Sequence, residues 1–60
     1  MNKPLHSIPN RAGFVLDVRD QSGKWHRTVV TFNEKNENYY LDLPPGVLWS
    51  SLIDWREVGQ

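Results

Sequence analysis

The residues of this chain that could take part in chemistry are two histidines, seven carboxylates and scattered serines, and their spacing favours no reaction. His6 lies in a stretch rich in proline and asparagine, whereas His26 lies in a segment with strand composition, so the two do not form a metal site. We expect His26 to face solvent. No serine stands at a recognisable spacing from a base, and the single glycines form no phosphate-binding loop. The sequence therefore predicts no catalytic residue, no metal and no cofactor.

A second group of residues could bind single-stranded nucleic acid. Three cations and an indole gather in one short segment, namely Arg19, Lys24, Trp25 and Arg27. Small β-sheets bind single strands by stacking bases on aromatic rings beside cations. The formal net charge is zero, however, whereas nucleic-acid binders usually carry a basic surplus. Nucleic-acid binding is therefore the alternative function.

The charges are divided unevenly between the two halves of the chain. Residues 1–32 contain five basic and two acidic side chains, and residues 33–60 contain the reverse. A chain of this kind could pair head to tail with itself or present one charged face to a partner.

The aromatic content favours protein binding. Three tryptophans and two tyrosines exceed what a core of this size can enclose, and Trp, Tyr and Arg dominate binding energy at interfaces. We expect Trp25 and Trp55 in the core, which leaves Tyr40 and Trp49, with Arg56, as candidates for an exposed protein interface. The edges of a small sheet offer a second route, either to a partner's sheet or to a homodimer. No membrane or small-molecule partner is expected.

A chain of 60 residues without cysteine has few means of stabilising a fold. A domain of this length buries only about 60% of the surface that its unfolded chain exposes. The lack of cysteine favours a reducing compartment, and no segment is apolar enough for a signal peptide or a membrane span, so we expect a cytoplasmic protein. Hydrophobic residues make up 38% of the chain, which indicates one globular domain over residues 13–60 after a flexible arm over residues 1–12.

Alternating apolar residues predict a three-stranded antiparallel meander over residues 13–19, 24–32 and 38–43. Residues 20–23 have the composition of a tight turn, which makes the first two strands a β-hairpin. The polar stretch 33–38 is too short for a parallel crossover, so the third strand must run antiparallel to the second.

Residues 47–58 fit two descriptions. Leu48, Leu52 and Trp55 have helical spacing, whereas alternation from Leu52 to Val58 is typical of a strand. A short helical turn followed by a strand is the preferred interpretation, with a helix throughout as the alternative. Either element should pack over the meander, so the fold class is α+β or mostly β.

The expected core combines the inward-facing residues of the strands with those of the last segment. It comprises Phe14, Leu16, Val18, Trp25, Val29, Leu41, Leu43, Leu52 and Trp55. A slip of one residue in the second strand would exchange Val29 and Thr31 for Val30 and Phe32.

Two stretches, RAGFVLD (residues 11–17) and GVLWSSLIDW (residues 46–55), together with the small size and the lack of cysteine, underlie one resemblance. The chain resembles the short accessory proteins encoded in the early regions of lambdoid temperate phages. The resemblance implies a protein that is made in an infected bacterium and acts by binding a host or phage protein. It carries no functional residues over to this chain. The sequence as a whole predicts a non-catalytic interaction protein.

Overall fold

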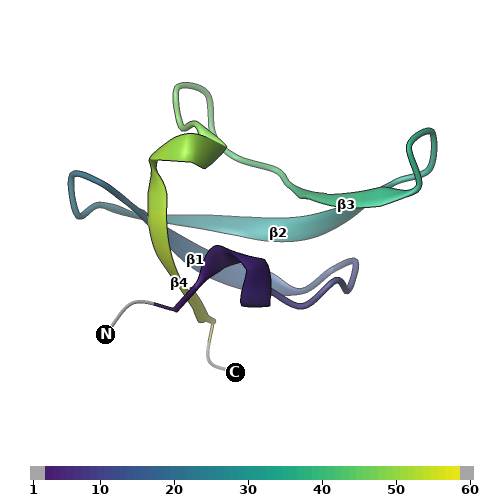
Figure 1. The fold of residues 1–60 in the computed structure, drawn as a ribbon, viewed down its shortest axis with the longest axis horizontal. Helices are drawn as coiled ribbons and strands as arrows, with labels where there is room; N and C mark the ends of the chain where they lie inside the picture. The colour runs from purple at the N-terminus through teal and green to yellow at the C-terminus, as the bar shows by residue number, and fades with distance from the viewer. Residues whose placement is uncertain (1–2, 59–60) are drawn as a thin grey trace.

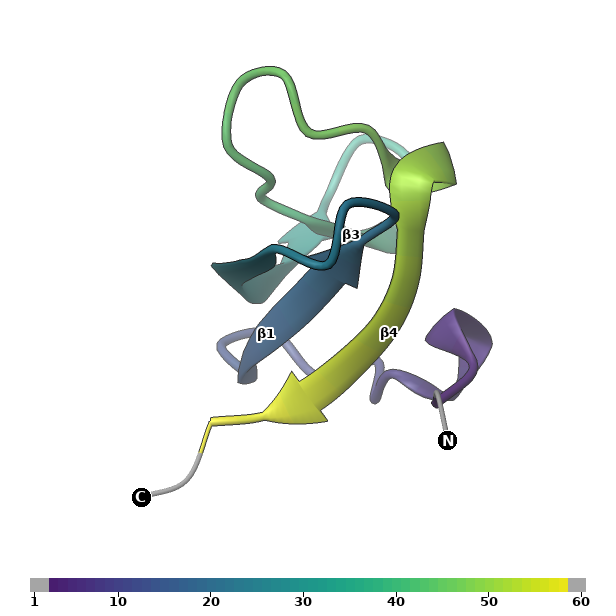
Figure 2. The same cartoon turned by 90° about the vertical axis from the view of Figure 1, so that its left-hand side faces the viewer.

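Four antiparallel strands form one curled sheet in the computed structural model, which describes residues 3–58 (Figures 1 and 2). They are β1 (Val15–Asp20), β2 (Trp25–Asn33), β3 (Asn38–Leu41) and β4 (Leu52–Glu57), in the spatial order β3-β2-β1-β4. Helical structure among these residues is limited to the 3-10 turns η1 (Leu5–Ser7) and η2 (Trp49–Ser51). The fold is therefore mostly β, and its sheet curls into an open half-barrel with an inner and an outer face (Figure 2).

The β1–β2 hairpin is confirmed, and its turn is organised by one carboxylate. The backbone N–H of Gly23 donates to the carbonyl of Asp20 at 2.9 Å, and Gly23 has a positive φ of 90° that favours glycine. One oxygen of the Asp20 carboxylate accepts the N–H of Lys24 at 3.1 Å, and the other lies 2.7 Å from Nε2 of His26. The expectation that His26 faces solvent is wrong, because its cross-strand partner Val18 belongs to the buried inner face.

The core lies on the inner face of the sheet. Its buried apolar residues are Phe14, Leu16, Val18, Val30, Leu52 and Trp55. Five of the predicted core residues are confirmed as buried, namely Phe14, Leu16, Val18, Leu52 and Trp55. Leu41 and Leu43, which were also predicted in the core, are half-buried against this cluster.

The register of β2 differs from the preferred one by one residue. Leu16 pairs with Thr28, so the even-numbered residues of β2 share its inner face, and Val30 enters the core. Trp25 and Val29, which were expected in the core, lie on the outer face instead. This is the one-residue slip given above as the alternative register, and it moves every side chain of β2 to the opposite face of the sheet.

The C-terminal segment forms a short turn and then a strand, as preferred, and the alternative of a helix throughout is wrong. β4 does not pack over the meander but extends the sheet beside β1, with Trp55 opposite Val18 and Arg56 opposite Asp17. Pairing with β4 satisfies the backbone N–H and C=O groups on the outer edge of β1. A helix packed over the face of the sheet would leave these groups unpaired. The α+β description is wrong for the same reason.

Residues 3–12 belong to the folded body, although the sequence predicts a flexible arm there. The indole N–H of Trp55 donates to the carbonyl of Pro4 and the hydroxyl of Ser7, both at 3.1 Å. Leu5 and Ile8 pack against the core cluster. Residues 1–2 of the predicted arm and residues 59–60 of the predicted domain lie outside the described residues.

Replacing Leu16 should test the inner core. We expect Leu16→Ala to lower the free energy of unfolding by about 2–5 kcal/mol, because the side chain is fully buried and its loss leaves a cavity. Leu48→Ala is the matched control, since Leu48 is 66% exposed and its truncation should change stability by less than about 0.5 kcal/mol. Urea unfolding followed by tryptophan fluorescence would measure both, and equal midpoints would contradict this assignment of the core.

Candidate functional site

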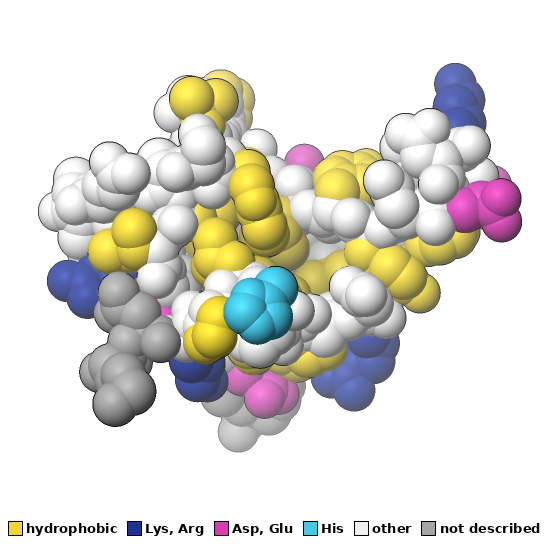
Figure 3. Space-filling view, viewed as in Figure 1, with side chains coloured by type: hydrophobic (Ala, Val, Ile, Leu, Met, Phe, Trp, Pro, Cys, Tyr) yellow, Lys and Arg dark blue, Asp and Glu magenta, His cyan; other side chains and the backbone are white. Residues whose placement is uncertain are grey.

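An apolar groove with a cavity volume of about 410 Å³ lies on the inner face of the half-barrel. Hydrophobic side chains gather in this hollow in the space-filling view (Figure 3). Three parts of the chain border it: the N-terminal arm, the β2–β3 hairpin with the residues that follow it, and η2. Its apolar lining includes Leu5, Ile8, Pro9, Leu41, Leu43 and Trp49. Among residues 3–58, no lysine, arginine, aspartate or glutamate lines the groove, so the described lining carries no permanent charge.

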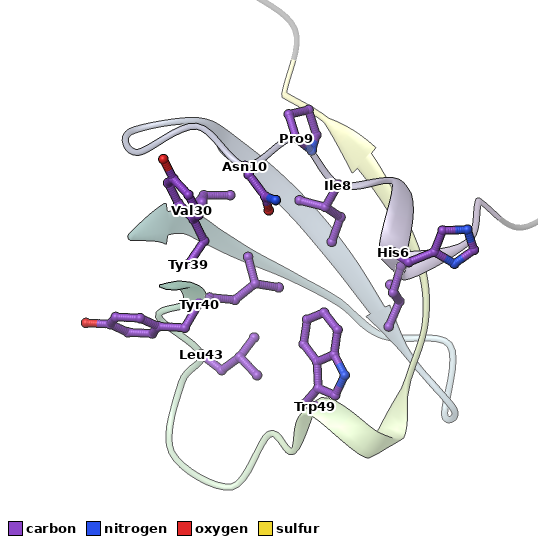
Figure 4. Close-up of a pocket in the computed structure, with 11 residues that line it drawn as sticks. His6, Ile8, Pro9, Asn10, Val30, Tyr39, Tyr40, Leu43 and Trp49 are labelled. Atoms are coloured by element: carbon purple, nitrogen blue, oxygen red, sulfur yellow. The ribbon is translucent and has the colours of Figure 1, made fainter. Parts of the chain in front are cut away.

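Trp49 forms one wall of the groove because the preceding loop turns the chain back over the sheet. The N–H of Val47 donates to the carbonyl of Pro44 at 3.1 Å, and Gly46 in this turn has a φ of 86°. The hydroxyl of Ser51 then donates to the carbonyl of Leu48 at 2.7 Å within η2. The Trp49 ring is directed into the groove and is still 52% exposed (Figure 4).

β3 forms the opposite wall. Tyr39 pairs with Phe32 on the inner face, and their rings meet edge to face at a centroid distance of 5.1 Å. Tyr40 borders the groove, but it pairs with Thr31, and its ring extends away from the groove (Figure 4). Tyr40 is 48% exposed, so the structure brings Tyr40 and Trp49 to one site with only Trp49 pointing into it.

The third wall is the N-terminal arm, which Trp55 holds in place. Besides the two hydrogen bonds from its indole N–H, Trp55 packs edge to face on Phe14 at 6.1 Å, and Nζ of Lys3 lies 4.6 Å from its ring centroid. The backbone N–H of Lys3 donates to the carboxylate of Asp54 at 2.7 Å. Sequence reasoning missed this wall, although the apolar pair Leu5 and Ile8 in a polar stretch is a signal of packing.

Loss of the indole N–H should release the arm. We expect Trp55→Phe to increase the rate of trypsin cleavage after Arg11, because a hydrogen bond of this kind contributes about 0.5–1.5 kcal/mol and holds the arm closed. Trp25→Phe makes the same chemical change on the outer face and should leave cleavage unchanged. Urea unfolding of both variants would separate local release from global unfolding. Equal cleavage rates at equal stability would show that Trp55 does not hold the arm.

The outer face gathers the residues proposed for nucleic-acid binding. Arg27 and Arg56 flank the carboxylate of Asp17, with Nε–O distances of 3.0 Å and 3.2 Å. The guanidinium of Arg56 lies 4.0 Å from the ring centroid of Trp25, and that of Arg19 lies 5.9 Å from it. Arg56 was expected at an interface with Tyr40 and Trp49, but the structure places it on the face opposite to the groove.

The Asp17 carboxylate partly compensates the positive charge of the outer face. Asp17 is only 7% exposed, and the Arg27 guanidinium lowers its pKa by hydrogen bonding, with Arg56 adding to the effect. Both arginines pair with this carboxylate through Nε, and the guanidinium of Arg56 covers one face of the Trp25 ring on which a base could otherwise stack. Lys24 is exposed at the adjacent turn.

The lowered pKa of Asp17 predicts a pH dependence of stability. An unfolded aspartate takes up its proton near pH 3.9, above the pKa of Asp17 in the folded protein. Its stabilising contribution is therefore complete above about pH 4 and is lost as the pH falls through the folded pKa. We expect the free energy of unfolding to fall less steeply between about pH 4 and pH 2 in Asp17→Asn than in the wild type. Urea unfolding across this range would measure both slopes, and identical slopes would contradict the ion-pair role.

Comparisons with known proteins found no matching family model, no similar curated protein and no similar solved structure. None of the helical turns in residues 3–58 is long and apolar enough to cross a membrane. Over the same residues, no group of three histidine, aspartate or glutamate side chains is placed to hold a metal ion.

Proposed function

We propose that this chain is a non-catalytic binding protein whose groove receives an apolar segment of a protein partner. The observation that carries the proposal is the uncharged groove, into which Trp49 projects while half of its surface remains exposed. Concave apolar surfaces with exposed aromatic residues mark interaction sites, and tryptophan is among the residues that contribute most binding energy.

The polar groups of the groove favour a protein segment over a small polar molecule. Small-molecule sites usually combine an apolar lining with several convergent polar groups. Here His6 and Asn10 are the polar side chains apart from the two tyrosines, and the imidazole of His6 points away from the groove (Figure 4).

The alternative function, binding of single-stranded nucleic acid on the outer face, has weaker support. Its candidate residues do lie near one another, but Arg27 and Arg56 both pair with the Asp17 carboxylate, and Asp54 lies opposite Arg19 in the register. Binding would have to replace these pairs, and the zero net charge supplies no surplus to attract phosphate.

The resemblance to phage accessory proteins suggests a host or phage protein of the bacterial cytoplasm as the partner. A bacterial lysate is therefore the source in which to search for it.

Trp49→Ala should weaken partner binding without unfolding the chain. The immobilised wild type, Trp49→Ala and Arg27→Ala would be incubated with bacterial lysate, and the retained proteins quantified by mass spectrometry. The wild type and Arg27→Ala should retain equal amounts of a groove ligand, whereas Trp49→Ala should retain at least about tenfold less. A tenfold loss corresponds to an interface anchor that contributes about 1.4 kcal/mol of binding free energy.

Two outcomes would contradict the groove as the binding site. Ligands retained equally by Trp49→Ala would exclude Trp49 as the anchor. Loss in Arg27→Ala alone would point to the outer face, and binding of an oligo(dT) strand of about 15 nucleotides that weakens steeply with salt would then support the nucleic-acid alternative.

A further inference from the structure

The two edges of the sheet differ in how they are protected against pairing with another strand. β4 carries Asp54, Arg56 and Glu57, and η1 packs beside it with the N–H of Lys3 bonded to Asp54. β3, by contrast, consists of Asn38, Tyr39, Tyr40 and Leu41, without a charge or a proline. Charged residues, prolines and covering segments are the usual means of blocking an edge strand. β3 is therefore the edge that is open to strand pairing.

The bonding pattern between β2 and β3 shows which backbone groups of β3 are available. The N–H of Asp42 donates to the carbonyl of Val29 at 3.3 Å, and Tyr40 pairs with Thr31 two residues earlier in β3. Bonded and non-bonded residues alternate along an antiparallel strand. Tyr39 and Leu41 therefore direct their N–H and C=O groups away from β2, toward the open edge.

From this pattern we propose that two copies of the chain pair through antiparallel β3 strands, with Tyr40 of each copy facing Tyr40 of the other on a twofold axis. In this register Tyr39 of one copy faces Leu41 of its partner, so the outward N–H and C=O groups of both residues are bonded. A twofold axis closes the assembly at two copies, as in most homodimers.

The neighbouring symmetric registers are less favourable. A shift that centres the pair on Tyr39 requires Glu37 in the ladder, but Glu37 has a φ of 52° in the turn before β3. A shift that centres it on Leu41 requires the N–H of Leu43, which already donates to the carbonyl of Leu41 at 3.0 Å. The proposed register uses the outward N–H and C=O groups of Tyr39 and Leu41. Of these, in residues 3–58, the Leu41 carbonyl already accepts the N–H of Leu43, and a carbonyl oxygen can accept a second bond.

The side chains agree with this register. Opposed residues of an antiparallel pair share one face, so Tyr39 and the partner's Leu41 meet on the inner face, where both line grooves. Asn38 faces the partner's Asp42, so no like charges oppose each other, and the exposed Tyr40 rings cover one another on the outer face. Pairing extends the proposed function, because it would place the two grooves side by side.

A single cysteine at position 40 gives a sharp test, because the chain contains no cysteine of its own. Tyr40 and the partner's Tyr40 form a non-hydrogen-bonded pair with Cα atoms about 4.5 Å apart, within the range of a disulfide. We expect Tyr40→Cys to form a covalent dimer rapidly under mild oxidation. Tyr39→Cys is the matched control, since that residue faces Leu41 of the partner and should crosslink much more slowly. Equal rates for the two variants would overturn the register.

Sedimentation equilibrium from about 10 μM to about 1 mM would test association of the unmodified chain, a range suited to small interfaces. The wild type should dimerise, and its melting temperature should rise with concentration. Tyr40→Lys should be monomeric because the two charges meet on the axis, whereas Thr31→Lys, on the same face within one copy, should still dimerise. A wild type that stays monomeric overturns the pairing. Loss of ligand in Trp49→Ala would then still support the groove, so the two proposals can fail separately.

Discussion

The indole of Trp55 is the interaction on which the rest of this small structure depends. Its ring packs on Phe14 in the core, while its N–H holds the carbonyl of Pro4 and the hydroxyl of Ser7. One side chain near the C-terminus thereby joins the N-terminal arm to the sheet. Together with the packing of Leu5 and Ile8 on the core, this connection forms one of the three walls of the groove.

The register of the β1–β2 hairpin separates the chemistry of the two faces. Because strand residues alternate, the pairing of Leu16 with Thr28 places Val30 in the core and assigns Trp25 and Arg27 to the outer face. The outer face can bury Asp17 only because arginines from β2 and β4 flank it on both sides. Burial of a lone carboxylate would be costly, whereas this one keeps two partners that reach solvent.

The sheet encloses only part of its inner face. A chain of 60 residues has four strands to cover one core, and the curl of the sheet encloses its centre but not the end near β3 and η2. Within residues 3–58, no further element covers the apolar side chains at that end. The open groove and the uncharged edge strand β3 therefore lie at the same end of the sheet.

Local patterns in the sequence determined much of this fold: the hairpin, the antiparallel third strand and the turn before β4 follow from alternation, turn residues and prolines within a few positions of each other. The same patterns indicated that Tyr40 and Trp49 would be exposed. Tertiary structure decided what depends on distant partners. The face on which Trp25 lies depends on the register between β1 and β2. The place of β4 beside β1 depends on the unpaired backbone groups at the edge of β1. The groove depends on the contact of Trp55 with the N-terminal arm, 48 to 51 residues away in the sequence. No local pattern carries such contacts, because their energies belong to pairs of segments that only the folded chain brings together.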